Sequence, residues 1–234
     1  MTAKKIYEIG EIPDLGEVPK EMYAWVIRED RLGVPEQAMQ IEKMPVQTPG
    51  KDEVLVMVMA VGINYNNVWA SQGIPISVIG KDTGYHIGGS DASGIVWAVG
   101  ENVKRWKIGD EVICQPSGFC GACSYCKAGD THYCEYAFTT GGDGPEEVWA
   151  GAFAEYMKTV ESCLFHKPKS ISFDAAALTE PLSGAWKGLI KHSEMEVGDD
   201  VVIIGVGGIG LLCMMVARAA GAGKLWVTSP ARLP

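Results

Sequence analysis

The sequence predicts an α/β plus β fold, in which a partly closed β-barrel domain is followed by the start of an α/β domain. Short β-rich runs separated by Gly, Pro and Asp turns recur before residue 170, as in antiparallel barrels. A continuous apolar run at 201–204 then leads into a glycine-rich turn and an apolar helical stretch, which is typical of a buried parallel strand followed by a helix. We expect an arm over residues 1–20, the barrel domain over 21–170 and an incomplete α/β domain over 171–234.

The individual elements follow from the local patterns. Gly and Pro alternate with acidic residues in the first 20 positions, which favours an extended arm lying on the domain. Strands of the barrel are expected at 22–28, 53–62, 93–99, 111–115 and 152–158. A helical stretch from 173 to about 192 is expected to be interrupted by Pro181. The α/β domain is expected to contain a strand at 201–204, a helix at 211–220 and a strand at 224–228.

Composition favours a globular cytoplasmic protein without nucleic-acid or membrane partners. The chain has 234 residues, of which 47% are hydrophobic, enough to bury a core. A net charge of -9 argues against a phosphate-binding surface, which needs clustered Lys and Arg. The N-terminus has no apolar signal-peptide core, and no run approaches the ~20 apolar residues of a membrane span.

Four closely spaced cysteines indicate a metal-binding lobe, expected over residues 114–138. Cys120, Cys123, Cys126 and Cys134 have the spacing of a compact tetrathiolate site. Zinc held by four thiolates is tetrahedral and closed, so we predict one structural zinc ion per chain that does no chemistry. Disulfides or free thiols are the alternative, which an intracellular composition disfavours.

The glycine-rich segment after the run at 201–204 predicts dinucleotide binding. Its residues are Gly205, Gly207, Gly208, Ile209 and Gly210 in a GxGxxG spacing, preceded by a strand and followed by a helix. In this setting the first glycine allows a tight turn, the second lets a pyrophosphate approach the backbone, and the third allows close packing of helix on strand.

The end of the strand at 224–228 favours NADPH over NADH. Enzymes that bind a free ribose 2′-hydroxyl normally place Asp or Glu here, whereas this chain has Thr228, Ser229 and Arg232. Hydroxyls and a guanidinium suit a 2′-phosphate, although Arg232 as plain surface charge is the alternative. Only two strands and one helix of the dinucleotide fold are present, so we expect this chain to be the front part of a longer polypeptide.

The order of parts resembles the medium-chain dehydrogenase/reductase superfamily, with a GroES-like barrel, a cysteine lobe and a Rossmann unit. More closely, residues 6–113 resemble the crotonyl-CoA carboxylase/reductase branch. The matching text is Tyr7-Glu8-Ile9-Gly10-Glu11-Ile12-Pro13, Gly62-Ile63-Asn64-Tyr65-Asn66-Asn67-Val68-Trp69-Ala70 and Tyr85-His86-Ile87-Gly88-Gly89-Ser90-Asp91-Ala92-Ser93-Gly94.

The resemblance implies where a catalytic metal would stand. Zinc alcohol dehydrogenases of the superfamily use a Cys and the His of a Gly-His-Glu string, and those places are Asn64 and Ser90 here, followed by Asp91. An amide and a hydroxyl are poor zinc ligands, so we expect no catalytic zinc. Glu180 lies in a segment similar to one near the metal of polyol dehydrogenases, which keeps a second zinc open as an alternative.

The resemblance implies NADPH-dependent reduction of an enoyl-CoA thioester such as crotonyl-CoA or acrylyl-CoA, by a dimer or tetramer. Asn64 and Tyr65 are the expected catalytic residues: Asn64 would hold the electrophile or a water, and Tyr65 would donate a hydrogen bond or a proton. Reductive carboxylation stays open, because the aromatic-Glu pair that carboxylating relatives carry before the stretch matching 151–154 is not clear here. The alternatives are a zinc-dependent alcohol or hydroxyacyl-CoA dehydrogenase and a non-catalytic quinone- or NADPH-binding relative.

Overall fold

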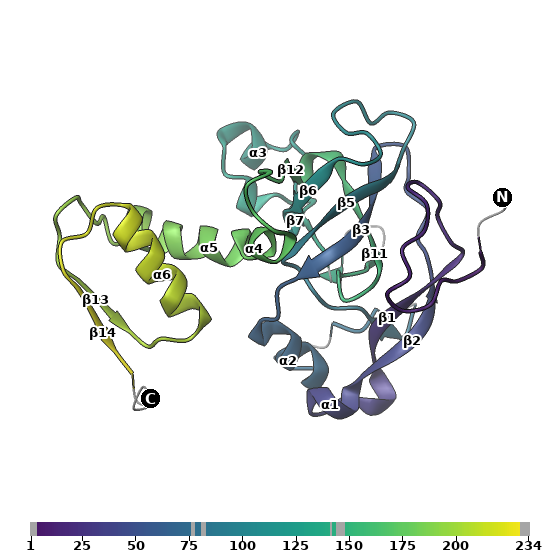
Figure 1. Cartoon of the computed structure of the whole chain (residues 1–234), viewed down its shortest axis with the longest axis horizontal. Coiled ribbons are helices and arrows are strands. Elements are labelled where there is room, and N and C mark those ends of the chain that lie inside the picture. Colours follow the sequence, from purple (N-terminus) through teal and green to yellow (C-terminus); the bar gives the residue numbers. More distant parts are fainter. Residues whose placement is uncertain (1–3, 76–77, 81–82, 141, 144–147, 230–234) are drawn as a thin grey trace. The chain divides into compact units, whose positions relative to one another are not determined.

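The computed structural model describes residues 4–75, 78–80, 83–140, 142–143 and 148–229 of the chain. It divides into two compact units, Met1–Ala177 and Leu178–Pro234 (Figure 1). The first unit carries the antiparallel strands and the cysteine lobe, and the second carries the glycine-rich turn. Among the described residues, no helix combines the length and the apolar character needed to span a bilayer.

The first unit consists mainly of short strands. These are β1 (Glu21–Arg28), β2 (Met39–Pro45), β3 (Glu53–Val61), β4 (Tyr85–His86), β5 (Ala92–Val99), β6 (Glu111–Cys114), β7 (Ser117–Gly118), β8 (Phe138–Thr139), β9 (Gly142–Asp143), β10 (Val148–Trp149), β11 (Tyr156–Val160) and β12 (Leu164–His166). The helices are α1 (Pro35–Ala38), α2 (Tyr65–Gln72), α3 (Ser124–Ala128) and α4 (Phe173–Ala177), with 3-10 turns at Glu29–Arg31, Thr131–Tyr133 and Glu161–Cys163.

Two antiparallel sheets form the body of this unit. One has the strand order β11-β3-β5-β6-β12 and the other β2-β1-β4. A bridge between Ala24 and Ala154, with the backbone N–H of Trp25 donating to the carbonyl of Phe153 at 2.8 Å, links the sheets. The described strands therefore form a β domain whose sheets meet without closing into a complete barrel.

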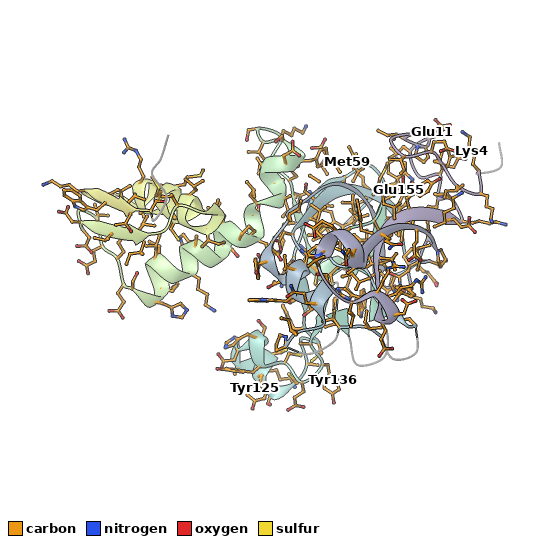
Figure 2. The ribbon with its side chains drawn as sticks, turned by 90° about the horizontal axis from the view of Figure 1, so that it is seen from below. Lys4, Glu11, Met59, Tyr125, Tyr136 and Glu155 are labelled. Carbon is orange, nitrogen blue, oxygen red and sulfur yellow. The ribbon has the colours of Figure 1, made fainter. Side chains whose placement is uncertain are left out.

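The core includes β3, an inner strand of the larger sheet between β11 and β5. Val54, Leu55 and Val56 on β3 are fully buried, since they are covered on both faces of the sheet. The N-terminal arm packs on this body: the Trp97 indole on β5 donates to the carbonyl of Glu17 at 2.9 Å. Within the arm, Lys4 pairs with Glu11, which Figure 2 shows beside each other at the edge of the unit.

The second unit contains α5 (Thr179–Trp186), a π-helix at Lys187–His192, β13 (Val201–Ile204), α6 (Gly208–Ala219) and β14 (Leu225–Thr228). Strands β13 and β14 are parallel, as the apolar run predicts, and their register pairs Ile204 with Thr228. The last residue of β13 therefore lies beside the last residue of β14. This pairing brings the glycine-rich turn and the segment after β14 to the same edge of the sheet.

Several element boundaries differ from those predicted. The helical stretch after 173 breaks at Leu178, and Pro181 lies in the first turn of α5, where a missing N–H breaks no helical hydrogen bond. The strand predicted at 152–158 begins only at Tyr156, because Ala152 and Phe153 donate their N–H groups to Gly89 and Gly88 outside the sheet. Strand β2 and helix α2 were not predicted, and α6 begins at Gly208 rather than at 211.

Candidate functional site

The four cysteines of the lobe lie close enough to share one metal ion. The sulfur atoms of Cys120, Cys123, Cys126 and Cys134 all lie within 4.8 Å of one another, and those of Cys120 and Cys126 are 3.9 Å apart. Tetrahedral zinc with Zn–S bonds of about 2.3 Å requires sulfur–sulfur distances of roughly 3.8 Å. None of the four cysteines is in a disulfide, so the disulfide alternative is not the arrangement that the structure has. The donor set and its spacing fit zinc.

Backbone N–H groups in the lobe point at the sulfur atoms. Cys134 Sγ accepts from the N–H groups of Cys120 at 3.3 Å and of Tyr136 at 3.4 Å. The N–H of Ala122 lowers the pKa of Cys120, and that of Cys126 lowers the pKa of Cys123 to about 6. Such N–H···S bonds stabilise thiolates, the form in which cysteine binds a metal. Desolvation, with a hydrogen bond to Cys123 as the next contribution, raises the pKa of Cys126 to about 12.

Asn64 lies at the start of α2 and connects that helix to the segment before β5. Its Oδ1 accepts from the backbone N–H of Asn66 at 3.0 Å, so Asn64 caps the helix. Its Nδ2 donates to Asp91 Oδ2 at 2.9 Å and approaches Ser90 Oγ at 3.4 Å. The structure thus brings together the amide of Asn64 and the hydroxyl of Ser90, the two groups that the resemblance places where zinc dehydrogenases would have metal ligands.

Tyr65, the other predicted catalytic residue, follows directly at the first position of α2. Its side chain is 65% exposed and packs edge-on against Trp69, with ring centroids 5.4 Å apart. Tyr65 is therefore not a buried core aromatic. An exposed phenol beside the Asn64 amide is available to a ligand, which keeps its catalytic role as a prediction.

The glycine-rich turn has the backbone geometry expected of a pyrophosphate-binding loop. Gly205 has a φ of 98°, which L side chains rarely adopt, and a Cβ at Gly210 would lie 2.0 Å from the carbonyl oxygen of Gly205. At Gly207 a Cβ would meet no protein atom within 4 Å. Gly207 is the N-cap residue of α6 and makes no side-chain capping hydrogen bond. The first N–H groups of α6, those of Gly208 and Ile209, therefore form a helix N-terminus that attracts anions.

Of the residues predicted to select the cofactor, Thr228 ends β14 and Ser229 follows it. Gly205 donates its N–H to the carbonyl of Thr228 at 2.9 Å, so this end of β14 lies next to the glycine-rich turn. This placement supports a shared cofactor site within the second unit. Arg232 lies outside the described residues. Glu180, the residue of the second-zinc alternative, lies in the first turn of α5 in the same unit.

An apolar cavity of about 570 Å³ lies between β1, β2, β3 and the segment preceding β11. Glu155 is its only carboxylate, and Figure 2 shows Glu155 and Met59, both lining residues, on the same side of the unit. Glu155 Oε2 accepts the N–H of Tyr23 at 2.9 Å. Desolvation nevertheless raises the pKa of Glu155, because the apolar walls disfavour the ionised form.

Replacing Glu155 with Gln is expected to stabilise the protein at neutral pH. The pKa of Glu155 is raised in the folded state. The contribution of Glu155 to the stability of the native protein is therefore greatest below its unfolded-state pKa and is lost as the pH rises through its folded-state pKa. The Gln amide oxygen still accepts from Tyr23. The unfolding midpoint of Glu155→Gln should rise by about 1–2 °C at pH 7. A shift of this size corresponds to a fraction of a kcal/mol in unfolding free energy for a chain of this length.

The measurement is thermal unfolding of the unmodified protein and of Glu155→Gln at pH 7 and at pH 4. The difference between their midpoints should vanish at pH 4. Glu101→Gln, at a carboxylate whose side chain is 75% exposed, serves as the control and should shift neither midpoint. A lower midpoint for Glu155→Gln at pH 7 would contradict the desolvation argument.

Two residues beside Asn64 were missed as site residues by the sequence reasoning. Asp91 was noted only as a replacement for Glu, yet its carboxylate is 3% exposed and accepts from both Asn64 and Ser90. Asn67 is buried and accepts the N–H of Gly89 at 3.1 Å. The repeated Asn residues after Gly62 were the only signal of this network in the sequence, because its partners lie 22 to 27 residues away.

A family comparison matches residues 50–169 to the alcohol dehydrogenase GroES-like domain. Among curated proteins, a crotonyl-CoA carboxylase/reductase of Cereibacter sphaeroides is 44% identical over 233 residues, covering 97% of this chain and 53% of the relative. A sorbitol dehydrogenase of Bacillus subtilis is 34% identical over 223 residues, covering 92% of this chain and 58% of the relative.

A solved structure has a similar backbone. The crotonyl-CoA carboxylase/reductase AntE, determined in complex with NADP, superposes with a TM-score of 0.85 at 36% identity, covering 98% of this chain and 58% of that one. The fold class predicted from the sequence is thereby confirmed. The chain spans about half the length of the curated relatives that it matches.

Proposed function

Since the chain belongs to the alcohol dehydrogenase GroES-like domain family, we propose that the native protein is an NADPH-dependent oxidoreductase that reduces a 2-enoyl-CoA thioester. The observation that carries this proposal is the Asn64–Ser90–Asp91 network. At the two positions where zinc dehydrogenases of the superfamily hold their metal, the chain has an amide and a hydroxyl bonded to one carboxylate. The identity to a crotonyl-CoA carboxylase/reductase supports the same reading.

The proposed chemistry needs little more than placement and hydrogen bonding. When bound, NADPH supplies a hydride to Cβ of the enoyl thioester, and negative charge then builds on the thioester oxygen. The α6 N-terminus binds the pyrophosphate through N–H groups, with Gly207 allowing the close approach. Asn64 donates an N–H to an oxygen of the electrophile or of a water, and the exposed Tyr65 donates a hydrogen bond or a proton.

Zinc has a structural role in this proposal. Cys120, Cys123, Cys126 and Cys134 would fill all four positions of a tetrahedral ion and leave none for substrate. Oxidation of an alcohol, by contrast, is assisted by a metal that lowers the pKa of the hydroxyl. The reductase therefore requires one zinc per chain, whereas the alcohol or hydroxyacyl-CoA dehydrogenase alternative requires two. The homo-oligomer and the cytoplasmic location stay predictions.

The proposal is tested by following NADPH oxidation on the native protein with crotonyl-CoA and acrylyl-CoA, each with and without bicarbonate. Enoyl-CoA-dependent oxidation is expected with both substrates, and product analysis of the bicarbonate arm separates plain reduction from reductive carboxylation. Alcohol-dependent reduction of NADP, together with two zinc ions per chain, would instead favour the dehydrogenase. Cofactor binding without turnover of any of these substrates would favour a non-catalytic relative.

The cofactor preference is expected to depend on the segment after β14. Arg232→Met should raise the Kd for NADPH by about tenfold or more and leave that for NADH nearly unchanged, since only NADPH carries the 2′-phosphate. Thr228→Val with Ser229→Ala should act in the same direction. Fluorescence titration of both cofactors measures the two affinities.

Arg218→Met is the matched control for this substitution, because it removes an exposed guanidinium from the last turn of α6 in the same unit. It should change neither affinity by more than about twofold. Equal losses of NADPH and NADH binding in Arg232→Met would contradict the assignment, as would a native preference for NADH.

A further inference from the structure

We propose that Asp91 is a positioning residue, whose carboxylate orients the amide of Asn64 so that one N–H remains available to the substrate. This inference rests on the proposed enoyl-CoA reduction and adds a residue to it. Asp91 precedes β5, is 3% exposed, and is held by its backbone carbonyl, which accepts the N–H of Gly62 at 2.8 Å. A carboxylate in this place can act on the substrate only through its neighbours.

The two ends of the Asn64 amide face partners of opposite polarity. An ionised carboxylate only accepts hydrogen bonds, so the group that lies 2.9 Å from Asp91 Oδ2 must be the NH₂. A backbone N–H only donates, so the atom that lies 3.0 Å from the N–H of Asn66 must be the carbonyl oxygen. A flipped amide would place oxygen against oxygen and N–H against N–H. Asp91 and the helix end together therefore fix one orientation.

One hydrogen-bond donor in the network has no close acceptor. The Ser90 hydroxyl donates its only hydrogen to Asp91 Oδ1 at 2.7 Å. The Asn64 NH₂ has two hydrogens, of which one bonds to Asp91 and the other has only a long 3.4 Å contact with Ser90 Oγ. This second N–H is the donor that a stronger acceptor would capture. An oxygen of the electrophile at Cα, or of the thioester, is such an acceptor.

Asp91→Asn replaces the acceptor-only carboxylate that fixes the orientation of the Asn64 amide, and it conserves the shape of the side chain. The new amide presents both an oxygen and an NH₂, so neither Asn64 nor Ser90 is held in one arrangement. With the native protein and crotonyl-CoA, kcat should fall by about tenfold, with the KM for NADPH changed by less than about twofold. Asp91→Glu, which keeps an acceptor, should retain more activity than Asp91→Asn. Asp110→Asn is the matched control, since the Asp110 carboxylate accepts the N–H of Lys107 in a surface turn.

A double-mutant cycle distinguishes positioning from a general structural effect. In an Asn64→Ala background, Asp91→Asn should change kcat by less than about twofold, because the group through which Asp91 acts is absent. The reversed pair, Asn64→Asp with Asp91→Asn, restores an N–H···O bond between the two positions but has no donor at 64. It should fold and have the low activity of Asn64→Ala. Activity above that level would contradict the role of Asp91 even if Asp91→Asn alone does not fold.

The outcomes separate this inference from the proposed function. Additive losses in the cycle, or activity restored by the reversed pair, would overturn the role of Asp91 while the enzyme still reduces crotonyl-CoA. Absence of enoyl-CoA turnover by the unmodified protein would overturn the proposed function and this inference with it. Non-additive losses with a low-activity reversed pair would support both.

Discussion

Removing zinc from the native protein is expected to open the lobe at residues 114–138 while the two sheets of the first unit remain folded. Four thiolates around one ion would contribute their binding free energy to local folding, because the unfolded lobe has no preformed metal site. Cys123→Ser should reduce bound zinc from one ion per chain to about a tenth of that or less. Limited proteolysis should then cleave within the lobe, and the unfolding midpoint should fall by about 5–10 °C.

Metal content and proteolysis are best measured together with a cysteine control. Cys213→Ser replaces a thiol on α6, outside the lobe, and should retain the full zinc content and the native cleavage pattern. The exposed Tyr125 and Tyr136, labelled on the lobe in Figure 2, provide a fluorescence signal for its opening. A protein that contains no zinc when purified, or that keeps its zinc after Cys123→Ser, would contradict the assignment.

Gly207→Ala is expected to weaken NADPH binding by about a hundredfold without lowering the stability of the protein. Among the described residues, no atom lies within 4 Å of a methyl group at this position, so we expect it to collide with a bound pyrophosphate. Gly210→Ala should behave differently, because its methyl group would lie 2.0 Å from the Gly205 carbonyl oxygen. Helix α6 must then move away from the turn, and both stability and cofactor binding should be lost.

The two variants are compared by thermal unfolding and by NADPH titration. Gly184→Ala is the control, since its methyl group also meets no atom within 4 Å but it lies in α5, away from the turn. It should alter neither quantity. Unchanged NADPH binding in a folded Gly207→Ala protein would remove the glycine-rich turn from the cofactor site.

Most strands of the fold could be predicted because their signals are local. The buried apolar residues of β3 and the apolar run of β13 before the glycine-rich turn are each sufficient to predict a strand without information from other segments. Strand β2 escaped prediction because it mixes charged and apolar residues and is largely exposed, and pairing with β1 along its whole length stabilises it instead. Helix α2 has almost no apolar periodicity, and the Asn64 cap and left-handed Gly73 that bound it become evident only from the backbone.

The candidate sites show the same division. The cysteine lobe and the glycine-rich turn lie within short continuous segments, so spacing alone identified them. The orientation of Asn64 depends on Asp91, 27 residues further along the chain, and no local pattern links the two. Likewise, the raised pKa of Glu155 arises from apolar walls contributed by three strands, which the sequence around position 155 does not contain. Long-range contacts of this kind carry the chemistry that sequence patterns leave open.

The order of strands in the larger sheet has a consequence for synthesis on the ribosome. Strands β3, β5 and β6 pair as they emerge, but the other edge of β3 is completed only by β11, where Glu53 pairs with Val160. At 5–20 residues per second, the intervening hundred or so residues take roughly 5–20 s to translate. During that interval an apolar strand edge is open to pairing with other nascent chains. Truncated chains that end before Tyr156 should therefore aggregate, whereas those that extend past His166 should remain in solution.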